Sequence, residues 1–126
     1  MTPERMVEII QQWGEPVQQG NVVDFQYKNV PITMIYDIPA DRMRLISPVK
    51  RQEDLTVEQM VAALSANFHS VIDVRYCLNN GVLWSAFIHP LSDLSALLLA
   101  SAIQQVTLSN ITFGKEYSGG ELRFDG

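Results

Sequence analysis

The residues best suited to chemistry are two histidines and one cysteine, and their spacing predicts structural roles. His69 and His89 form no HExxH motif or other spacing that would place two metal ligands on one helix face. We expect His69 to lie at the carboxyl end of the second helix, where the helix dipole stabilises a positive charge. We expect His89, which precedes Pro90, to contact a backbone group. Cys77 has one arginine, Arg75, two residues away, which is little support for a reactive thiolate. A structural thiol is therefore expected.

The acidic residues also fit structural roles. Glu53, Asp54 and Glu58 lack the alternating ligand spacing of a calcium loop and suit the start of a helix. Gly119-Gly120 lacks the lysine and further glycines of a phosphate-binding loop. No arrangement for nucleophilic catalysis can be assembled from the sequence. We therefore expect no enzyme, no metal site and no cofactor.

Composition narrows the class of protein. The 126 residues hold 9 Lys and Arg against 14 Asp and Glu, a formal net charge of -5. This balance argues against nucleic acid as a partner, because phosphates are neutralised by basic patches. A single cysteine excludes an internal disulfide. The length predicts one domain spanning residues 1–126.

Membrane and targeting signals are not expected either. The first residues include Glu4 and lack the basic-then-apolar order of a signal peptide. The most apolar stretch, residues 94–103, is half of the about 20 residues that cross a membrane. We expect a cytoplasmic protein with no membrane partner.

Hydrophobic periodicity predicts the order α-β-β-β-α-β-β-α, an α+β domain with an antiparallel five-stranded sheet packed with helices. Period-2 alternation marks the strands, and Asn79-Asn80-Gly81 marks a hairpin turn. Residues 18–21 are expected to form a polar connection, and residues 121–124 a short edge strand. The expected helices are 3–13, 57–69 and 91–109, and the expected strands are 23–27, 32–38, 43–46, 72–78 and 82–88.

The second helix has two unequal apolar faces. Thr56-Val57-Glu58-Gln59 predicts a capping box at its start. The small face allows close approach of another helix, although helix propensity explains alanine equally well. The large face comprises Val57, Met60, Val61, Leu64 and Phe68, and the small face comprises Ala62, Ala63 and Ala66.

Charge is missing from the last third of the chain. Asp93 is the only charged residue between Tyr76 and Gly114. In the last helix, Leu97, Leu98 and Leu99 span about 200° of the helix wheel, so at least one points away from a single buried face. Either this helix lies in a groove of its own domain, or its face meets another chain. The uncharged stretch at residues 82–84 is attributed to burial in the sheet.

This order of elements resembles the type III secretion chaperone fold, a superfamily that includes class I secretion chaperones and YbjN-type bacterial proteins. The resemblance is carried by the hairpin and the residues that follow it, which are similar to the YbjN hairpin and the helix after it. These residues are VIDVRY (71–76) and NGVLWSAFIHPL (80–91). The resemblance implies a homodimer without cofactor. In secretion chaperones each protomer offers apolar surface to an extended segment of a secreted protein.

The leading hypothesis is a small, non-catalytic, dimeric protein-binding module. Secretion chaperones dimerise through the second helix and neighbouring strand, which implies Val61, Leu64 and Phe68 here, although these residues could also be core. A YbjN-like regulatory protein that binds no unfolded cargo is the alternative. A small-molecule or enzymatic role would need a buried polar cluster around His89 or Asp73. The candidate protein-interaction residues are Val61, Leu64, Phe68, Leu97, Leu98, Leu99 and Ile103.

Overall fold

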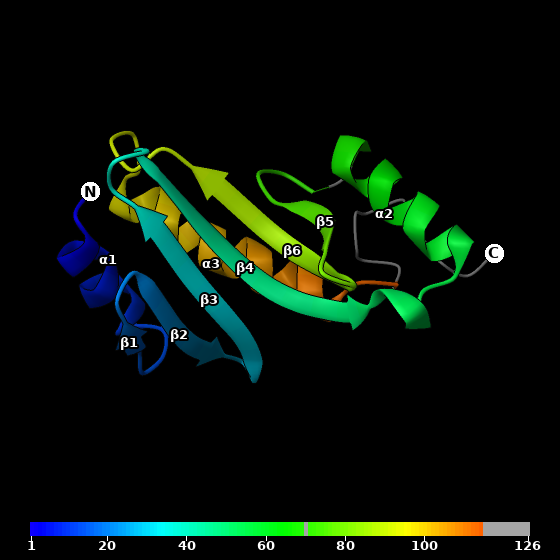
Figure 1. Ribbon diagram of the computed structural model, residues 1–126, viewed down its shortest axis with the longest axis horizontal. Helices are drawn as coiled ribbons and strands as arrows, with labels where there is room; N and C mark the ends of the chain where they lie inside the picture. Colours follow the sequence, from blue (N-terminus) through cyan, green and yellow to red (C-terminus); the bar gives the residue numbers. More distant parts are fainter. Residues whose placement is uncertain (70, 115–126) are drawn as a thin grey trace.

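The computed structural model describes residues 1–69 and 71–114 as three α-helices and one six-stranded sheet (Figure 1). The strand expected at residues 121–124 lies outside the described residues. The helices are α1 (Pro3–Ile10), α2 (Val57–His69) and α3 (Ala96–Ile111), with a short 3-10 turn at Gln52–Asp54. The strands are β1 (Val17–Gln19), β2 (Val22–Tyr27), β3 (Val30–Asp37), β4 (Arg42–Arg51), β5 (Arg75–Asn79) and β6 (Val82–His89).

The sheet is antiparallel throughout, with the strand order β1-β2-β3-β4-β6-β5. This confirms the predicted α+β class and antiparallel sheet, but six strands replace the expected five. The additional strand is β1, which falls where a polar connection was expected. Its three residues are all exposed, so they show no alternation, and backbone pairing to β2 across the Gly20-Asn21 turn defines the strand.

Several predicted boundaries were wrong. Strand β4 continues past residue 46 to Arg51 and accommodates Pro48 next to a register shift, where a proline without its N–H is tolerated. Strand β5 begins at Arg75 instead of residue 72. Helix α3 begins at Ala96, because Ser95 caps it by accepting a hydrogen bond from the Leu98 N–H at 3.0 Å.

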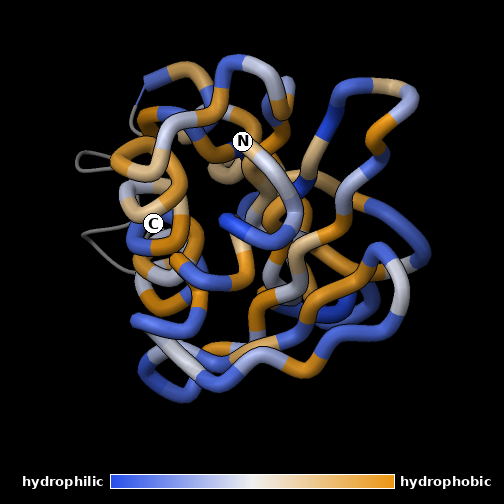
Figure 2. Tube along the Cα trace, turned by 90° about the vertical axis from the view of Figure 1, so that its left-hand side faces the viewer, coloured by the Kyte–Doolittle hydropathy of each residue, from blue (hydrophilic) through white to orange (hydrophobic). Residues whose placement is uncertain are grey.

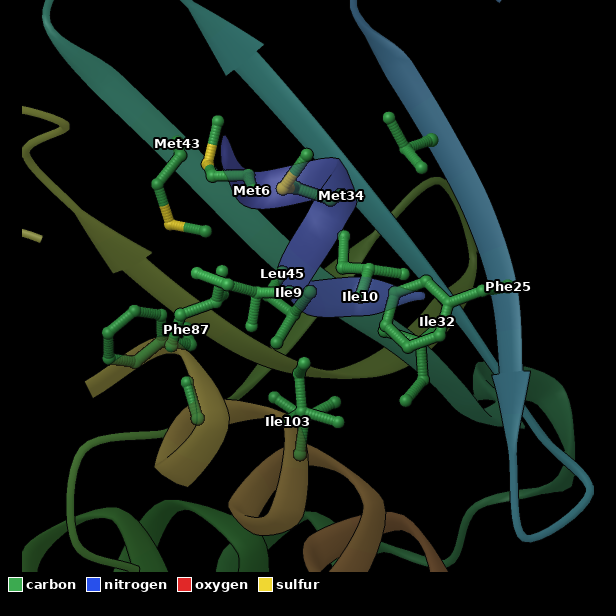
Figure 3. Packing of buried hydrophobic residues seen from close by; sticks show 14 of the residues in the cluster. Met6, Ile9, Ile10, Phe25, Ile32, Met34, Met43, Leu45, Phe87 and Ile103 are labelled. Atoms are coloured by element: carbon green, nitrogen blue, oxygen red, sulfur yellow. The ribbon is translucent and has the colours of Figure 1, made fainter. Parts of the chain in front are cut away.

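The main core lies between one face of the sheet and the helices α1 and α3 (Figure 3). Hydrophobic and hydrophilic residues alternate along the strands (Figure 2), so each strand sends one set of side chains to this face. Residues from α1, β2, β3, β4, β6 and α3 meet there, and those labelled in Figure 3 are Met6, Ile9, Ile10, Phe25, Ile32, Met34, Met43, Leu45, Phe87 and Ile103.

Helix α2 packs separately, beside β5 and away from α1 (Figure 1). Its own small core joins Ala63 and Ala66 to Tyr76 and Leu83. Tyr76 connects this cluster to α3, because its hydroxyl donates to the Ser109 carbonyl oxygen at 2.7 Å. All three helices therefore lie on or beside the same face of the sheet.

Candidate protein-binding surfaces

Helix α2 begins with the predicted capping box. The Thr56 N–H donates to Gln59 Oε1 at 3.0 Å, and the Gln59 N–H donates to Thr56 Oγ1 at 3.1 Å. These reciprocal bonds satisfy backbone N–H groups that a helix start leaves without partners, so the start of the helix is well defined.

The face of α2 that packs on the sheet is the small one. Ala63 and Ala66 are buried against Tyr76 and Leu83, because alanine lets the helix backbone approach the sheet closely. The opposite face carries large apolar side chains and is open to solvent. We call it the α2 apolar stripe; its members are Val57 (72% exposed), Val61 (57%), Leu64 (70%) and Phe68 (85%).

The spacing of the α2 apolar stripe is 4, 3 and 4 residues, which keeps all four side chains on one line along the helix. The same spacing forms the seam of paired helices. Three candidate residues from the sequence, Val61, Leu64 and Phe68, therefore lie together on one exposed surface. Val57 extends it by one turn.

The four candidate residues in α3 do not share a surface. Leu97 is 82% exposed, whereas Leu98 is half-buried and packs against the main core. Leu99 and Ile103 are fully buried in that core, so we leave both out of the proposed surface. The uncharged face of α3 thus belongs largely to the chain's own core, because the helix lies under the sheet.

The two edges of the sheet differ. At the β5 edge, the side-chain amide of Asn67 in α2 bonds both main-chain groups of Tyr76, with N···O distances of 2.8 and 3.0 Å. Asn67 thereby occupies positions that another strand would need. At the other edge, β1 pairs only with β2 among the described residues, and Val17 is exposed there. The β1 edge can therefore accept an added strand.

The histidines lie in structural settings. His89 Nδ1 lies 2.8 Å from the Pro90 carbonyl oxygen, as expected for contact with a backbone group, and its ring stacks on Phe87. The ring of His69, at the end of α2, packs edge-to-face on Phe68. The two imidazoles thus belong to separate elements.

Asp73 and Cys77 also have structural surroundings. The Asp73 carboxylate accepts a hydrogen bond from Gln105 Nε2 at 3.1 Å. Burial raises the pKa of the Cys77 thiol, although the positive charges of Arg44 and Arg75 oppose the shift. The thiol is therefore protonated at neutral pH and is a poor nucleophile.

The acidic cluster before α2 is held by an arginine. Arg51 forms ion pairs with Glu53 at 3.0 Å and with Asp54 at 3.1 Å. Among residues 1–69 and 71–114, no group of three or more His, Cys, Asp or Glu side chains could hold a metal ion. Within the same residues, no helix has the length and apolar character needed to cross a membrane.

Comparison with known proteins gives a likeness of fold. No family model matches the chain, and no curated protein matches it in sequence. Among solved structures, a chain of the ExsC–ExsE complex is similar with a TM-score of 0.68 and 14% identity, over 97% of this chain and 94% of that chain. A chain of the HopA1–SchA chaperone–effector complex is similar with a TM-score of 0.65 and 14% identity, over 86% and 88%.

A third similar structure is the Yersinia pestis type III secretion chaperone SycH in complex with a stable fragment of YscM2. The TM-score is 0.67 at 12% identity, over 89% of this chain and 99% of that chain. The identities are low, so these matches concern the fold. They confirm the type III secretion chaperone-like fold predicted from the order of elements.

Proposed function

We propose that this chain is a non-catalytic protein-binding module that forms a homodimer through the α2 apolar stripe and holds a segment of another protein. The observation that carries the proposal is the exposure of Val61, Leu64 and Phe68 on one line of α2. The fold supports it, because similar structures include a chaperone–effector complex and a secretion chaperone bound to a protein fragment.

The energetics favour a second copy on the α2 apolar stripe. Burying a Val, Leu or Phe side chain contributes about 1.5–3 kcal/mol relative to leaving it exposed. Two α2 helices packed side by side along a 4-3-4 seam would bury these side chains from both copies. A twofold arrangement uses the same surface on each protomer, so the contact closes and leaves no stripe exposed.

The free edge of β1 supplies a place for a partner segment. Strand addition gives affinity through main-chain hydrogen bonds and specificity through side-chain pockets. Beside this edge, Glu15, Val17 and Phe25 line a shallow pocket that could take a side chain of the added strand. The opposite edge is occupied by Asn67 at Tyr76, so β1 is the better acceptor.

Light scattering on the purified chain tests the dimer. We expect the wild-type mass to be twice that of one chain and Leu64→Glu to give a folded monomer, because a carboxylate in the stripe would be buried on association. The matched control is Ile38→Glu, an exposed isoleucine in the turn after β3, which should leave the dimer intact. A monomeric wild type, or a Leu64→Glu variant that remains dimeric, would contradict the proposal.

The regulatory alternative uses the same fold and a different partner. It would place a folded signalling protein where the leading proposal places an extended segment. Purification of the chain with its natural partner, followed by limited proteolysis of that partner, separates the two. An extended segment is protected from cleavage only while bound, whereas a folded partner resists cleavage alone. The cytoplasmic location stays a prediction.

A further inference from the structure

The face of the sheet opposite the helices has no cover among the described residues. In Figure 1 the strands β3, β4 and β6 cross in front of α3, so the view looks onto this outer face. Cross-strand partners share a face in an antiparallel sheet, so the register identifies its residues. Ile35 pairs with Arg44, and Arg44 pairs with Ile88.

An apolar surface lies along the middle of the outer face. Ile88 is 54% exposed, and Ile35, Ile46 and Trp84 are half-buried. The Trp84 indole N–H donates to the Asn79 carbonyl oxygen at 3.1 Å, which fixes the orientation of the ring. Apolar side chains that are grouped on one open face of a sheet can form part of an interaction surface.

Strands β4, β5 and β6 carry a positive net charge, whereas the chain as a whole is negatively charged. These strands hold four arginines and one lysine and no aspartate or glutamate, and among the described residues Arg51 is the one of these cations that forms ion pairs, with Glu53 and Asp54. The whole chain, by contrast, carries a net charge of -5. Of these cations, Arg44 and Arg75 lie on the outer face beside the apolar surface, so positive charge and apolar side chains meet there.

Arg44 lies between two isoleucines on this face. Within the described residues its guanidinium makes no ion pair or hydrogen bond, although it stands between Ile35 and Ile88 in the register. Arg75 is on the same face and donates to the carbonyl oxygens of Ile72 and Val74. An arginine among apolar side chains suits a carboxylate that arrives together with apolar groups.

We propose that the outer face binds an acidic, amphipathic segment of a partner protein. Its apolar side chains would cover Ile46, Trp84 and Ile88, and a carboxylate would pair with the Arg44 guanidinium. The inference rests on the proposed protein-binding function and adds a second contact surface for a partner segment, separate from the β1 edge. Nucleic acid is disfavoured, because the arginines are few and separated by isoleucines and the chain as a whole is acidic.

Trp84 supplies the signal for a direct test. The chain has two tryptophans, so Trp13→Phe leaves Trp84 as the only one. The probes are two synthetic 12-residue peptides with alternating valine or leucine and a charged residue, glutamate in one and lysine in the other. We expect the glutamate peptide to change the Trp84 fluorescence and to bind at least tenfold more tightly than the lysine peptide.

Charge reversal on the protein should reverse this preference. Arg44→Glu is expected to lower the affinity for the glutamate peptide at least tenfold and to raise the affinity for the lysine peptide. The control variant Arg5→Glu, at an exposed position on α1, should change neither affinity. The inference would be overturned if both peptides bound equally well or if neither bound. It would also be overturned if Arg44→Glu left the affinity for the glutamate peptide unchanged. Tighter binding of an oligothymidylate than of the glutamate peptide would also overturn it, in favour of nucleic acid.

The outcomes separate this inference from the proposed dimer. If light scattering shows the dimer but neither peptide binds, only the inference on the outer face fails. If the wild-type chain is monomeric and the glutamate peptide binds in an Arg44-dependent way, the dimer fails and the inference stands. A loss of the dimer in Arg44→Glu would show that a second copy occupies the outer face and would overturn the inference.

Discussion

The side-chain amide of Asn67 pairs with the main chain of Tyr76 as a neighbouring strand would. The Tyr76 N–H donates to Asn67 Oδ1 at 2.8 Å, and Asn67 Nδ2 donates to the Tyr76 carbonyl oxygen at 3.0 Å. One side chain thus joins α2 to the edge strand β5 and satisfies two partly buried backbone groups. It also leaves Phe68, the next residue, on the solvent side of the helix.

Replacing Asn67 should therefore destabilise the contact between α2 and the sheet. Asn67→Ala removes both hydrogen bonds that Asn67 makes to the Tyr76 main chain, and removing one partner of a buried hydrogen bond costs about 1–3 kcal/mol. We expect a loss of this size in urea unfolding. Hydrogen exchange should show faster exchange at the Tyr76 amide. Unchanged protection of that amide would show that Asn67 is not its main partner.

Two leucines in α3 provide a matched test of burial. Leu99 is fully buried and Leu97 is 82% exposed, although both are leucines in one helix. Leu99→Ala should cost about 2–5 kcal/mol of the free energy of unfolding, because it removes packed atoms and leaves a cavity. Leu97→Ala should change it by less than about 0.5 kcal/mol. Equal losses at the two positions would contradict the placement of α3.

The sequence pattern predicted most elements because their signals are local. Alternation in β2 and β3, the capping box at Thr56, and the Asn80-Gly81 turn each depend on a few adjacent residues. Both turn residues have positive φ, 51° and 75°, as a tight hairpin turn requires. Strand β1 was missed because its exposed residues are defined by pairing with β2 alone.

The candidate surfaces were harder to predict because they depend on which face of an element meets the rest of the chain. The large residues of α2 look like a core face, yet Ala63 and Ala66 pack inward and leave Leu64 exposed. Trp84 was expected to be buried in the sheet, yet it is half-buried and lies between the buried Leu83 and Ser85. Periodicity identifies the faces of an element, and tertiary packing decides which face is buried.

Asp41 should make stability depend on pH in the acid range. Its carboxylate accepts hydrogen bonds from the Ser92 hydroxyl at 2.6 Å and the Ser92 N–H at 2.9 Å, which lower its pKa from the usual 3.8. A lowered pKa in the folded state contributes stability that is present above pH 3.8 and is lost as the pH falls through the folded value.

Asp41→Asn tests this dependence. The asparagine cannot ionise, and it tolerates the positive φ of 54° at this position. We expect the free energy of unfolding of the wild-type chain to fall relative to that of the variant as the pH is lowered from 5 to 2.5. Urea unfolding at each pH measures this difference. Parallel stability curves over that range would show that Ser92 does not stabilise the ionised carboxylate.

Cys77 should react slowly, and the pH dependence should show the reason. Burial raises the pKa of its thiol from the usual 9.0, so less thiolate is present at pH 8 than in the unfolded chain. Alkylation by iodoacetamide, followed by intact mass, should be slower in the folded chain, with a midpoint above pH 9.0. If burial only restricted the access of iodoacetamide to the thiol, the alkylation rate reached at high pH would be lower, but the midpoint of the pH dependence would not move. Arg44→Gln should move the midpoint higher still, because the positive charge of Arg44 favours the thiolate.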